Sequence, residues 1–376
     1  MSIQVNRNNI KERKLYLDVI RVFAIVSISL NHAVNRTYDN FVDQQAEFMA
    51  SSVVSSLIKT VISVFSRIGV PLFLMITGVL ILNKTFESSK DLKKFYKHNV
   101  LQLFITTEIW YCIMYWFIVL CNPGVTVLQD EGFVNAIFEM LKTMLFLNQR
   151  SLGSMWYMPM ILCIYLVLPF WAVIVKKFDI RYVFIPLLVS FLSFMLLPSL
   201  NFFRLFQGWD WLTTVLNTGD LPSIYLIYIL VGYWLGTGGL SKLKDWVILV
   251  LALASFGSCC AYQYYAYSMP ENYLVSYSSP GILLTAAFIF AYLKRKEKYF
   301  IRFKDAFAYL SKISFAIYFV HIVIMEFINW NFTFSNMHSC FKMILLEVIS
   351  ILGSLLIIRI FSKNKICKKY LFMIKD

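Results

Sequence analysis

The stretch YLDVIRVFAIVSISLNHAV, residues 16–34, is apolar almost throughout and is about as long as a membrane span. It nevertheless contains Asp18, Arg21 and His32. A charged side chain at the centre of a bilayer costs about 2.5–3.5 kcal/mol even on the more lenient scale, so these groups are expected to face protein rather than lipid. The stretch therefore predicts a transmembrane helix whose polar side faces the interior of a helix bundle.

Helical geometry places these three polar residues on one side of the helix. Arg21 and His32 are eleven steps apart in the sequence. At ~100° and ~1.5 Å per step, this separation is three turns plus about 20°, and ~16.5 Å along the axis. Asp18 precedes Arg21 by three residues and lies on the same stripe, where the two side chains can interact. The polar stripe therefore runs most of the way across the predicted membrane.

The composition of the whole chain supports a membrane protein. Of its 376 residues, 59% are hydrophobic and 15% are charged, whereas about 25% are charged in soluble domains. The mean hydropathy is +0.67. The net charge of +14 does not indicate nucleic acid, because the basic residues cluster in short segments between apolar runs. We therefore expect the protein to interact with a lipid bilayer and not with nucleic acid.

Ten apolar segments have roughly the ~20 residues that a helix needs to cross a ~30 Å hydrocarbon layer. They lie at 15–34, 66–83, 99–120, 156–175, 182–198, 222–240, 245–265, 280–293, 312–331 and 341–361. With the N-terminus inside, the predicted cytoplasmic segments contain 27 of the 35 Lys and Arg residues, and the external segments contain seven. Because cytoplasmic loops carry such an excess, we predict an all-α polytopic membrane protein with both termini cytoplasmic.

The chain is predicted to consist of a basic cytoplasmic leader (1–14), a transmembrane domain (15–361) and a basic cytoplasmic tail (362–376). The first span is interpreted as retained, because charges interrupt it and no small-residue cleavage site follows. Segments 41–65 and 133–149 contain helical patterns and are interpreted as interfacial or re-entrant; counting the second as a span would change the topology. The cysteine spacing predicts no metal site.

Further ionisable groups fall within the predicted membrane. Arg67 opens the second span at the level of His32, and His321 and Glu108 lie in the middle of their spans. Several such groups in one membrane domain predict a functional cavity inside the bundle. Simpler explanations stay open: the acid–arginine pair of the first span as a structural ion pair, Arg67 as an interfacial anchor, and each histidine as a hydrogen-bonded structural residue.

Four segments of the chain carry a resemblance to a known family. They are LDVIRVFAIVSISLNH (17–32), RIGVPLFLMITGVLIL (67–82), WYMPMILCIYLVLP (156–169) and ISFAIYFVHIVIM (313–325). In this order, and with ten spans, they resemble the integral-membrane acyltransferase family three, whose members acylate cell-surface glycans with a cytoplasmic acyl-CoA. Asp18, Arg21 and His32 match the family's LDxxR beginning and its Arg-x10-His signature.

The resemblance implies a mechanism at the plasma membrane. The donor would be acetyl-CoA, with its phosphates at the cytoplasmic mouth near Arg21, which Asp18 would position. His32 would act as general base on an acceptor hydroxyl or would briefly carry the acyl group. Arg67 would offset negative charge on the carbonyl oxygen or orient His32, and His321 is a further candidate catalytic residue. The acceptor would be a surface or lipid-linked glycan.

The chain departs from the family where the third span begins. The family usually has a basic kkR there, whereas this chain has Lys97, His98 and Asn99. If the missing arginine normally holds the CoA phosphates, that role would pass to Lys93, Lys94 and Lys97.

Two other classes of function fit the same spans. The internal charges would also suit a polysaccharide exporter or transporter, with Asp18, Arg21 and His321 lining its path. Against it, the sequence shows no paired half-repeats and no matching Gly/Pro-broken spans of the kind transporters often have. An inactive partner that scaffolds an envelope synthase is the third possibility. The glycan, the hydroxyl that is acylated and the oligomeric state are not readable from the sequence.

Overall fold

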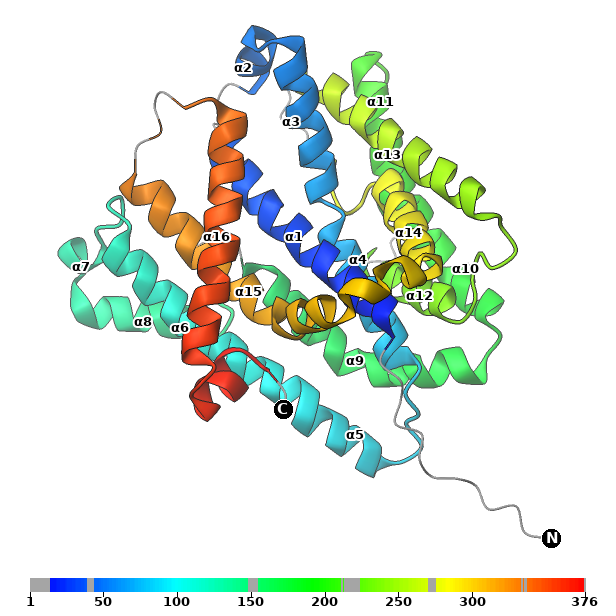
Figure 1. The fold of residues 1–376 in the computed structure, drawn as a ribbon, viewed down its shortest axis with the longest axis horizontal. Helices are drawn as coiled ribbons and strands as arrows, with labels where there is room; N and C mark the ends of the chain where they lie inside the picture. Colours follow the sequence, from blue (N-terminus) through cyan, green and yellow to red (C-terminus); the bar gives the residue numbers. More distant parts are fainter. Residues whose placement is uncertain are drawn as a thin grey trace.

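The computed structural model describes residues 14–38, 44–147, 155–210, 212, 224–269, 275–332, 334 and 337–374. Every regular element in these ranges is helical (Figure 1). The α-helices are α1 (Leu15–Tyr38), α2 (Gln44–Ala50), α3 (Val53–Ser66), α4 (Gly69–Thr77), α5 (Ser89–Phe95), α6 (Leu101–Cys121), α7 (Val127–Asp130), α8 (Gly132–Met144), α9 (Tyr157–Lys177), α10 (Ile180–Phe191), α11 (Leu197–Phe206), α12 (Ile224–Gly236), α13 (Asp245–Tyr267), α14 (Pro280–Arg295), α15 (Lys304–Asn331) and α16 (Ser339–Phe361). π-helical turns η1 (Gly78–Leu82), η2 (Tyr96–Val100), η4 (Leu192–Leu196) and η6 (Cys367–Leu371) and the 3-10 helix η5 (Glu297–Phe303) complete the list.

Eight helices in the described ranges are long and apolar enough to cross a membrane. They are Leu15–Tyr38, Val53–Leu82, Ser89–Cys121, Tyr157–Lys177, Ile180–Leu205, Asp245–Tyr267, Glu297–Asn331 and Ser339–Phe361. The prediction of an all-α polytopic membrane protein is confirmed. The other two predicted spans correspond to α12 and α14, which have 13 and 16 residues. These two helices pack against each other and against α4, and a helix enclosed by protein does not have to match the thickness of a bilayer.

Helix α1 lies in the middle of the bundle and packs against α15, α4, α16 and α3 (Figure 1). In the most apolar 18-residue stretch of α1, 72% of the residues are buried. The corresponding fractions are 17% for α13 and 22% for α16. The outer helices therefore offer apolar sides to lipid, whereas α1 is surrounded by protein. The predicted interior position of the polar stripe follows from this arrangement.

The segment 41–65 differs from the interfacial or re-entrant piece that the sequence suggested. Helix α3 leads into α4 and η1, and together they form an apolar helical run of 30 residues, Val53–Leu82. The run is interrupted only at Arg67 and Ile68. Pro71 explains the interruption, because its ring clashes with the carbonyl four residues earlier and is tolerated only in a first helical turn.

The two sides of α3 show that it is embedded among other helices. Its polar residues Ser56 and Ser63 are buried, whereas Val53 and Leu57 are 66% and 49% exposed. Buried polar residues and exposed apolar residues are the reverse of the pattern in soluble proteins. They are typical of a helix with lipid on one side and protein on the other. Helix α3 therefore forms one helical run with α4 and η1 inside the predicted transmembrane domain (15–361).

The segment predicted at 133–149 forms α8, which has only 13 residues and is too short to span a bilayer of ~30 Å. It packs on α6, where the indole of Trp116 lies 3.1 Å from the sulfur of Met140. Phe133 and Phe138 are about 60% exposed, at 62% and 58%. This geometry is that of an interfacial helix. Residues 148 and 149 lie outside the described part.

The C-terminal segment, predicted as a cytoplasmic tail, is folded onto α6. Thr106 Oγ1 donates to the carbonyl of Tyr370 at 2.7 Å, and Trp110 Nε1 donates to the carbonyl of Leu371 at 2.8 Å. Phe372 is 1% exposed and belongs to the main hydrophobic core. Residues 370–374 are therefore part of the helix bundle rather than a free extension.

Two glycines allow α12 to approach the α4–η1 run closely. A Cβ at Gly78 would lie 1.9 Å from the carbonyl oxygen of Ile229, and a Cβ at Gly232 would lie 2.3 Å from the Cα of Met75. Small residues at such crossings let helix backbones pack in membranes, where dispersion contacts drive association. Gly78 and Gly232 therefore set the position, against α12, of the α4–η1 run, which lines the candidate site described next.

We expect Gly78→Ala to lower the thermal stability of the detergent-solubilised protein. The added methyl group must displace the backbone of α12, and overpacking of this kind costs about 1–3 kcal/mol. Gly257→Ala is the matched control, because a Cβ there meets no atom within 4 Å. Tm followed by intrinsic fluorescence measures the effect. An unchanged Tm in Gly78→Ala would show that this helix crossing is less tight than described.

Candidate active site

A serine from α15 holds the part of the predicted stripe that contains Asp18 and Arg21. Arg21 Nη1 donates to Ser311 Oγ at 2.8 Å, and Ser311 Oγ donates to Asp18 Oδ1 at 2.6 Å. The direct contact between Arg21 Nη1 and Asp18 Oδ1 is longer, at 3.9 Å. Asp18 is 4% exposed. The buried carboxylate thus orients the guanidinium mainly through the intervening hydroxyl, which joins α1 to α15.

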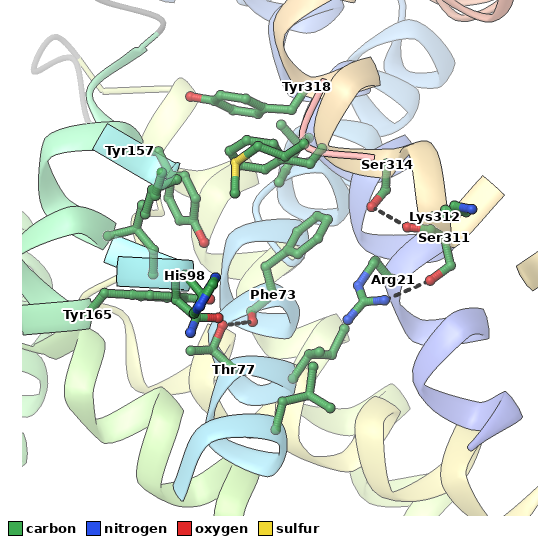
Figure 2. Close-up of a pocket in the computed structure, with 18 residues that line it drawn as sticks. Arg21, Phe73, Thr77, His98, Tyr157, Tyr165, Ser311, Lys312, Ser314 and Tyr318 are labelled. Carbon is green, nitrogen blue, oxygen red and sulfur yellow. Dashed lines mark hydrogen bonds between the residues drawn. The ribbon is translucent and has the colours of Figure 1, made fainter. Parts of the chain in front are cut away.

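Arg21 and Ser311 line a cavity of about 530 Å3, a size typical of small-molecule sites. Figure 2 shows Tyr157, Tyr165 and His98 across the cavity from these two residues. His98 is exposed, so the cavity reaches the surface where α6 begins. An anionic group of a ligand can therefore meet the guanidinium from that end, while the remainder of the ligand extends into the bundle.

Two π-helical turns contribute to this cavity. Leu80 comes from η1, and His98 and Asn99 come from η2. Such turns insert an extra residue into a helix and often occur at functional sites, because they redirect side chains that a regular helix would point elsewhere. The last wall comes from Met373 of the folded C-terminal segment. The cavity is thus assembled from parts of the chain that are far apart in the sequence.

The predicted donor lysines do not join Arg21. Lys93 and Lys97 line a separate apolar groove of about 700 Å3, which also includes Leu162 and Leu166 of α9. Lys94 is exposed and lines neither space. The Arg21 cavity is lined instead by Asn99, the position at which the resemblance led us to expect an arginine, and by Lys312, which is exposed at its edge.

The two histidines of the predicted site lie side by side inside the bundle. His32 is 6% exposed and His321 is 0% exposed, and their ring centroids are 5.3 Å apart. The Nδ1 of His321 lies 2.7 Å from the carbonyl oxygen of Ile317. Because a carbonyl only accepts, this nitrogen carries the proton, and the Nε2 of the neutral ring is an acceptor. Within the described residues, neither His321 Nε2 nor His32 Nδ1 has a hydrogen-bond partner.

His32 lines a second and much smaller cavity of about 10 Å3, close to the space that one water molecule needs. Tyr157, Tyr318 and Ile28 line both this space and the Arg21 cavity. The rings of the two tyrosines have centroids 5.9 Å apart. The two cavities therefore meet at these three side chains, and a ligand that entered near Arg21 would pass them to reach His32.

Arg67 lies near His32. It occupies the break between α3 and α4, beside the hydroxyl of Tyr277. The positive charges of Arg67 and Arg36 are close enough to interact electrostatically with His32. Arg36 also donates to the backbone carbonyl of His32 at 3.2 Å and forms an ion pair with Glu326. The structure thus brings Arg67, His32 and His321 into one neighbourhood.

A comparison with the sequence models of known protein families matches residues 14–363, nearly the whole chain, to an acyltransferase domain. The chain belongs to the integral-membrane acyltransferase family three. No curated protein and no solved structure matches it. The protein is therefore a membrane acyltransferase, and the matched range includes every residue of both cavities except Met373.

One residue of this acyltransferase's site, Ser311, was not singled out by the sequence reasoning. Ser311 and Ser314 share one face of α15 with Tyr318 and His321, within an arc of about 80°. The spacing of these four polar residues in an apolar helix was the available signal. Outside the two cavities, the sequence reasoning also passed over Glu347 of α16, which is half-buried and whose Oε2 accepts from Ser29 at 2.7 Å.

Glu108, which the sequence placed among the interior ionisable groups, lines neither cavity of the acyltransferase. Its Oε1 is buried without a hydrogen-bond partner in the described part of the chain. Its position on α6 therefore separates it from the Arg21–His32 region.

Proposed function

We propose that this acyltransferase moves an acetyl group from cytoplasmic acetyl-CoA to a hydroxyl of a surface or lipid-linked glycan at the plasma membrane. One observation carries the proposal: a line of two cavities begins at Arg21, near the predicted cytoplasmic end of α1, and ends at the buried pair His32 and His321. This arrangement suits a donor with an anionic head and a thin reactive arm.

The donor's head and arm match different parts of the large cavity. Arginine is well suited to phosphate because its guanidinium can donate two parallel hydrogen bonds. In this proposal Arg21 binds a phosphate of CoA at the exposed mouth near His98. The pantetheine arm then runs between Phe73 and Tyr165, which line the same cavity, and carries the thioester toward Tyr157 and Tyr318.

The reaction at the inner end conserves atoms and protons. His32 takes the proton of the acceptor hydroxyl, and the oxygen attacks the thioester carbonyl. The carbon–oxygen bond of the ester forms, the carbon–sulfur bond breaks, and CoA leaves as a thiolate that recovers the proton from the His32 imidazolium. Arg67 offsets the negative charge that develops on the carbonyl oxygen. In the alternative route His32 carries the acetyl group before the hydroxyl attacks.

The test is a mass comparison of surface polysaccharide from cells with and without the protein. Acetyl-sized differences that depend on the protein, together with transfer from labelled acetyl-CoA in proteoliposomes, are the expected result. An exporter would change the amount of polysaccharide without changing its acetyl content, and it would move glycan in vesicles that contain no acyl-CoA. That outcome would replace the enzymatic proposal with the transport one.

The position of Asn99 leads to a separate prediction about the donor site. Asn99→Arg places a cation in the Arg21 cavity, and a hydrogen bond to a charged group contributes about 1.5 kcal/mol or more. We therefore expect the KM for acetyl-CoA to fall by about tenfold, with kcat little changed. Lys93→Ala and Lys97→Ala, in the separate groove, should leave KM unchanged. A higher KM in Lys93→Ala or Lys97→Ala would instead indicate that these lysines bind the CoA phosphates.

A further inference from the structure

The cavity around His32 is small because aromatic rings enclose it. Tyr157 and Tyr318 separate it from the large cavity, and Trp156 and Tyr277, whose ring centroids are 5.5 Å apart, line it as well. Val70 of α4 is one of its few aliphatic neighbours and is 5% exposed. The walls are therefore mostly aromatic and come from five different parts of the chain.

The ring of Tyr318 is fixed by its neighbours on α15. Its centroid lies 5.1 Å from that of Phe319 and 6.3 Å from that of Phe315. Tyr157 packs edge-on against Trp156 at 6.2 Å. Close-packed interiors resist added volume, because a ring that is held on several sides moves only at a cost in free energy. The boundary between the two cavities is thus a defined constriction.

We infer that Tyr157, Tyr318 and Val70 restrict the transferred acyl group to acetyl; this inference rests on the proposed function. When the thioester carbonyl reaches His32, the remainder of the acyl group must lie in the cavity of about 10 Å3. A space that accepts about one water-sized group accepts a methyl group, which is of similar size. A propionyl or butyryl chain would have to displace the aromatic walls.

The expected discrimination follows from the cost of one extra methylene in a closed apolar site, which is about 10–200-fold in kcat/KM. The wild-type protein should therefore use acetyl-CoA at least about tenfold better than propionyl-CoA, and butyryl-CoA still less well. The small cavity at His32 limits the size of the acyl group, whereas free CoA is proposed to occupy the large cavity. Changes to the small cavity should therefore leave the affinity for free CoA unchanged.

The experiment compares acetyl-, propionyl- and butyryl-CoA as donors for the full-length protein in proteoliposomes, with surface polysaccharide from cells that lack the protein as the acceptor. Val70→Ala, Tyr157→Leu and Tyr318→Leu each enlarge the small cavity, and we expect the propionyl-to-acetyl ratio of kcat/KM to rise about tenfold. Val64→Ala is the control for Val70→Ala. It removes the same side-chain volume from a residue that is 0% exposed and lines neither cavity. Its ratio should equal that of the wild type.

The outcomes separate this inference from the proposed function. Acetyl transfer by the wild type without discrimination against propionyl-CoA would overturn the size limit alone. An unchanged ratio in Val70→Ala would also overturn it, even if the leucine variants fail to accumulate. Absence of transfer from every donor by the folded wild type would overturn the proposed function and the size limit with it.

Discussion

Replacing His32 with alanine is expected to lower acetyl transfer by about 10²–10⁴-fold, the usual contribution of a positioned acid–base group. The effect should be large because the buried ring of His32 lines the small cavity at which the donor arm must end. The rate of labelled acetyl transfer to glycan in proteoliposomes measures it. The amount of protein in the membrane should be unchanged.

His338→Ala is the matched control for this experiment. His338 is an exposed histidine at the start of α16 and lines neither cavity. Its loss should leave transfer near the wild-type level. Retained transfer in His32→Ala would remove His32 from the mechanism and leave His321 Nε2, the other buried acceptor of the pair, as the candidate base.

Arg21→Ala is expected to raise the KM for acetyl-CoA by about 10–100-fold, because a hydrogen bond between charged groups contributes about 1.5–3 kcal/mol. kcat should change much less, since a contact with the distant phosphates is equally strong in the ground state and the transition state. Steady-state kinetics with varied acetyl-CoA separates the two parameters. Asp18→Asn should give a smaller rise in KM, because Ser311 still contacts the guanidinium.

Arg181→Ala provides the control for a lost positive charge. The side chain of Arg181 is 88% exposed and lies at the start of α10, away from the cavity. Its KM for acetyl-CoA should match that of the wild type. An unaltered KM in Arg21→Ala would contradict the assignment of Arg21 to the donor and would leave it as part of a structural network with Asp18.

The spans and the interior stripe were predictable because both depend on short-range properties of the sequence. Hydropathy over about 20 residues decides whether a segment enters a bilayer, and a repeat of 3.6 residues decides which side chains share a face. Asp18, Arg21 and His32 could therefore be placed on one buried side of α1. The same reasoning, applied to α15, would have added Ser311.

The differences from the sequence-based interpretation arose where a segment's neighbours decide its environment. Segment 41–65 was interpreted as interfacial or re-entrant, whereas α3 continues into the α4–η1 run and buries one side against other helices. The basic C-terminal segment was predicted as a cytoplasmic tail, and the structure adds that Thr106 and Trp110 of α6 hydrogen-bond to its carbonyls. Neither partner is close in the sequence.

The amino-acid order alone was sufficient to establish the all-helical membrane class, the family and the polar side of α1, since each is encoded within one or two helices. It was not sufficient to show that His321 meets His32, that Asn99 rather than Lys97 lines the Arg21 cavity, or that Tyr157 and Tyr318 divide the two cavities. These relations depend on how far each helix is rotated and shifted against its neighbours. Close contacts between distant segments, such as Gly78 against α12, determine those positions.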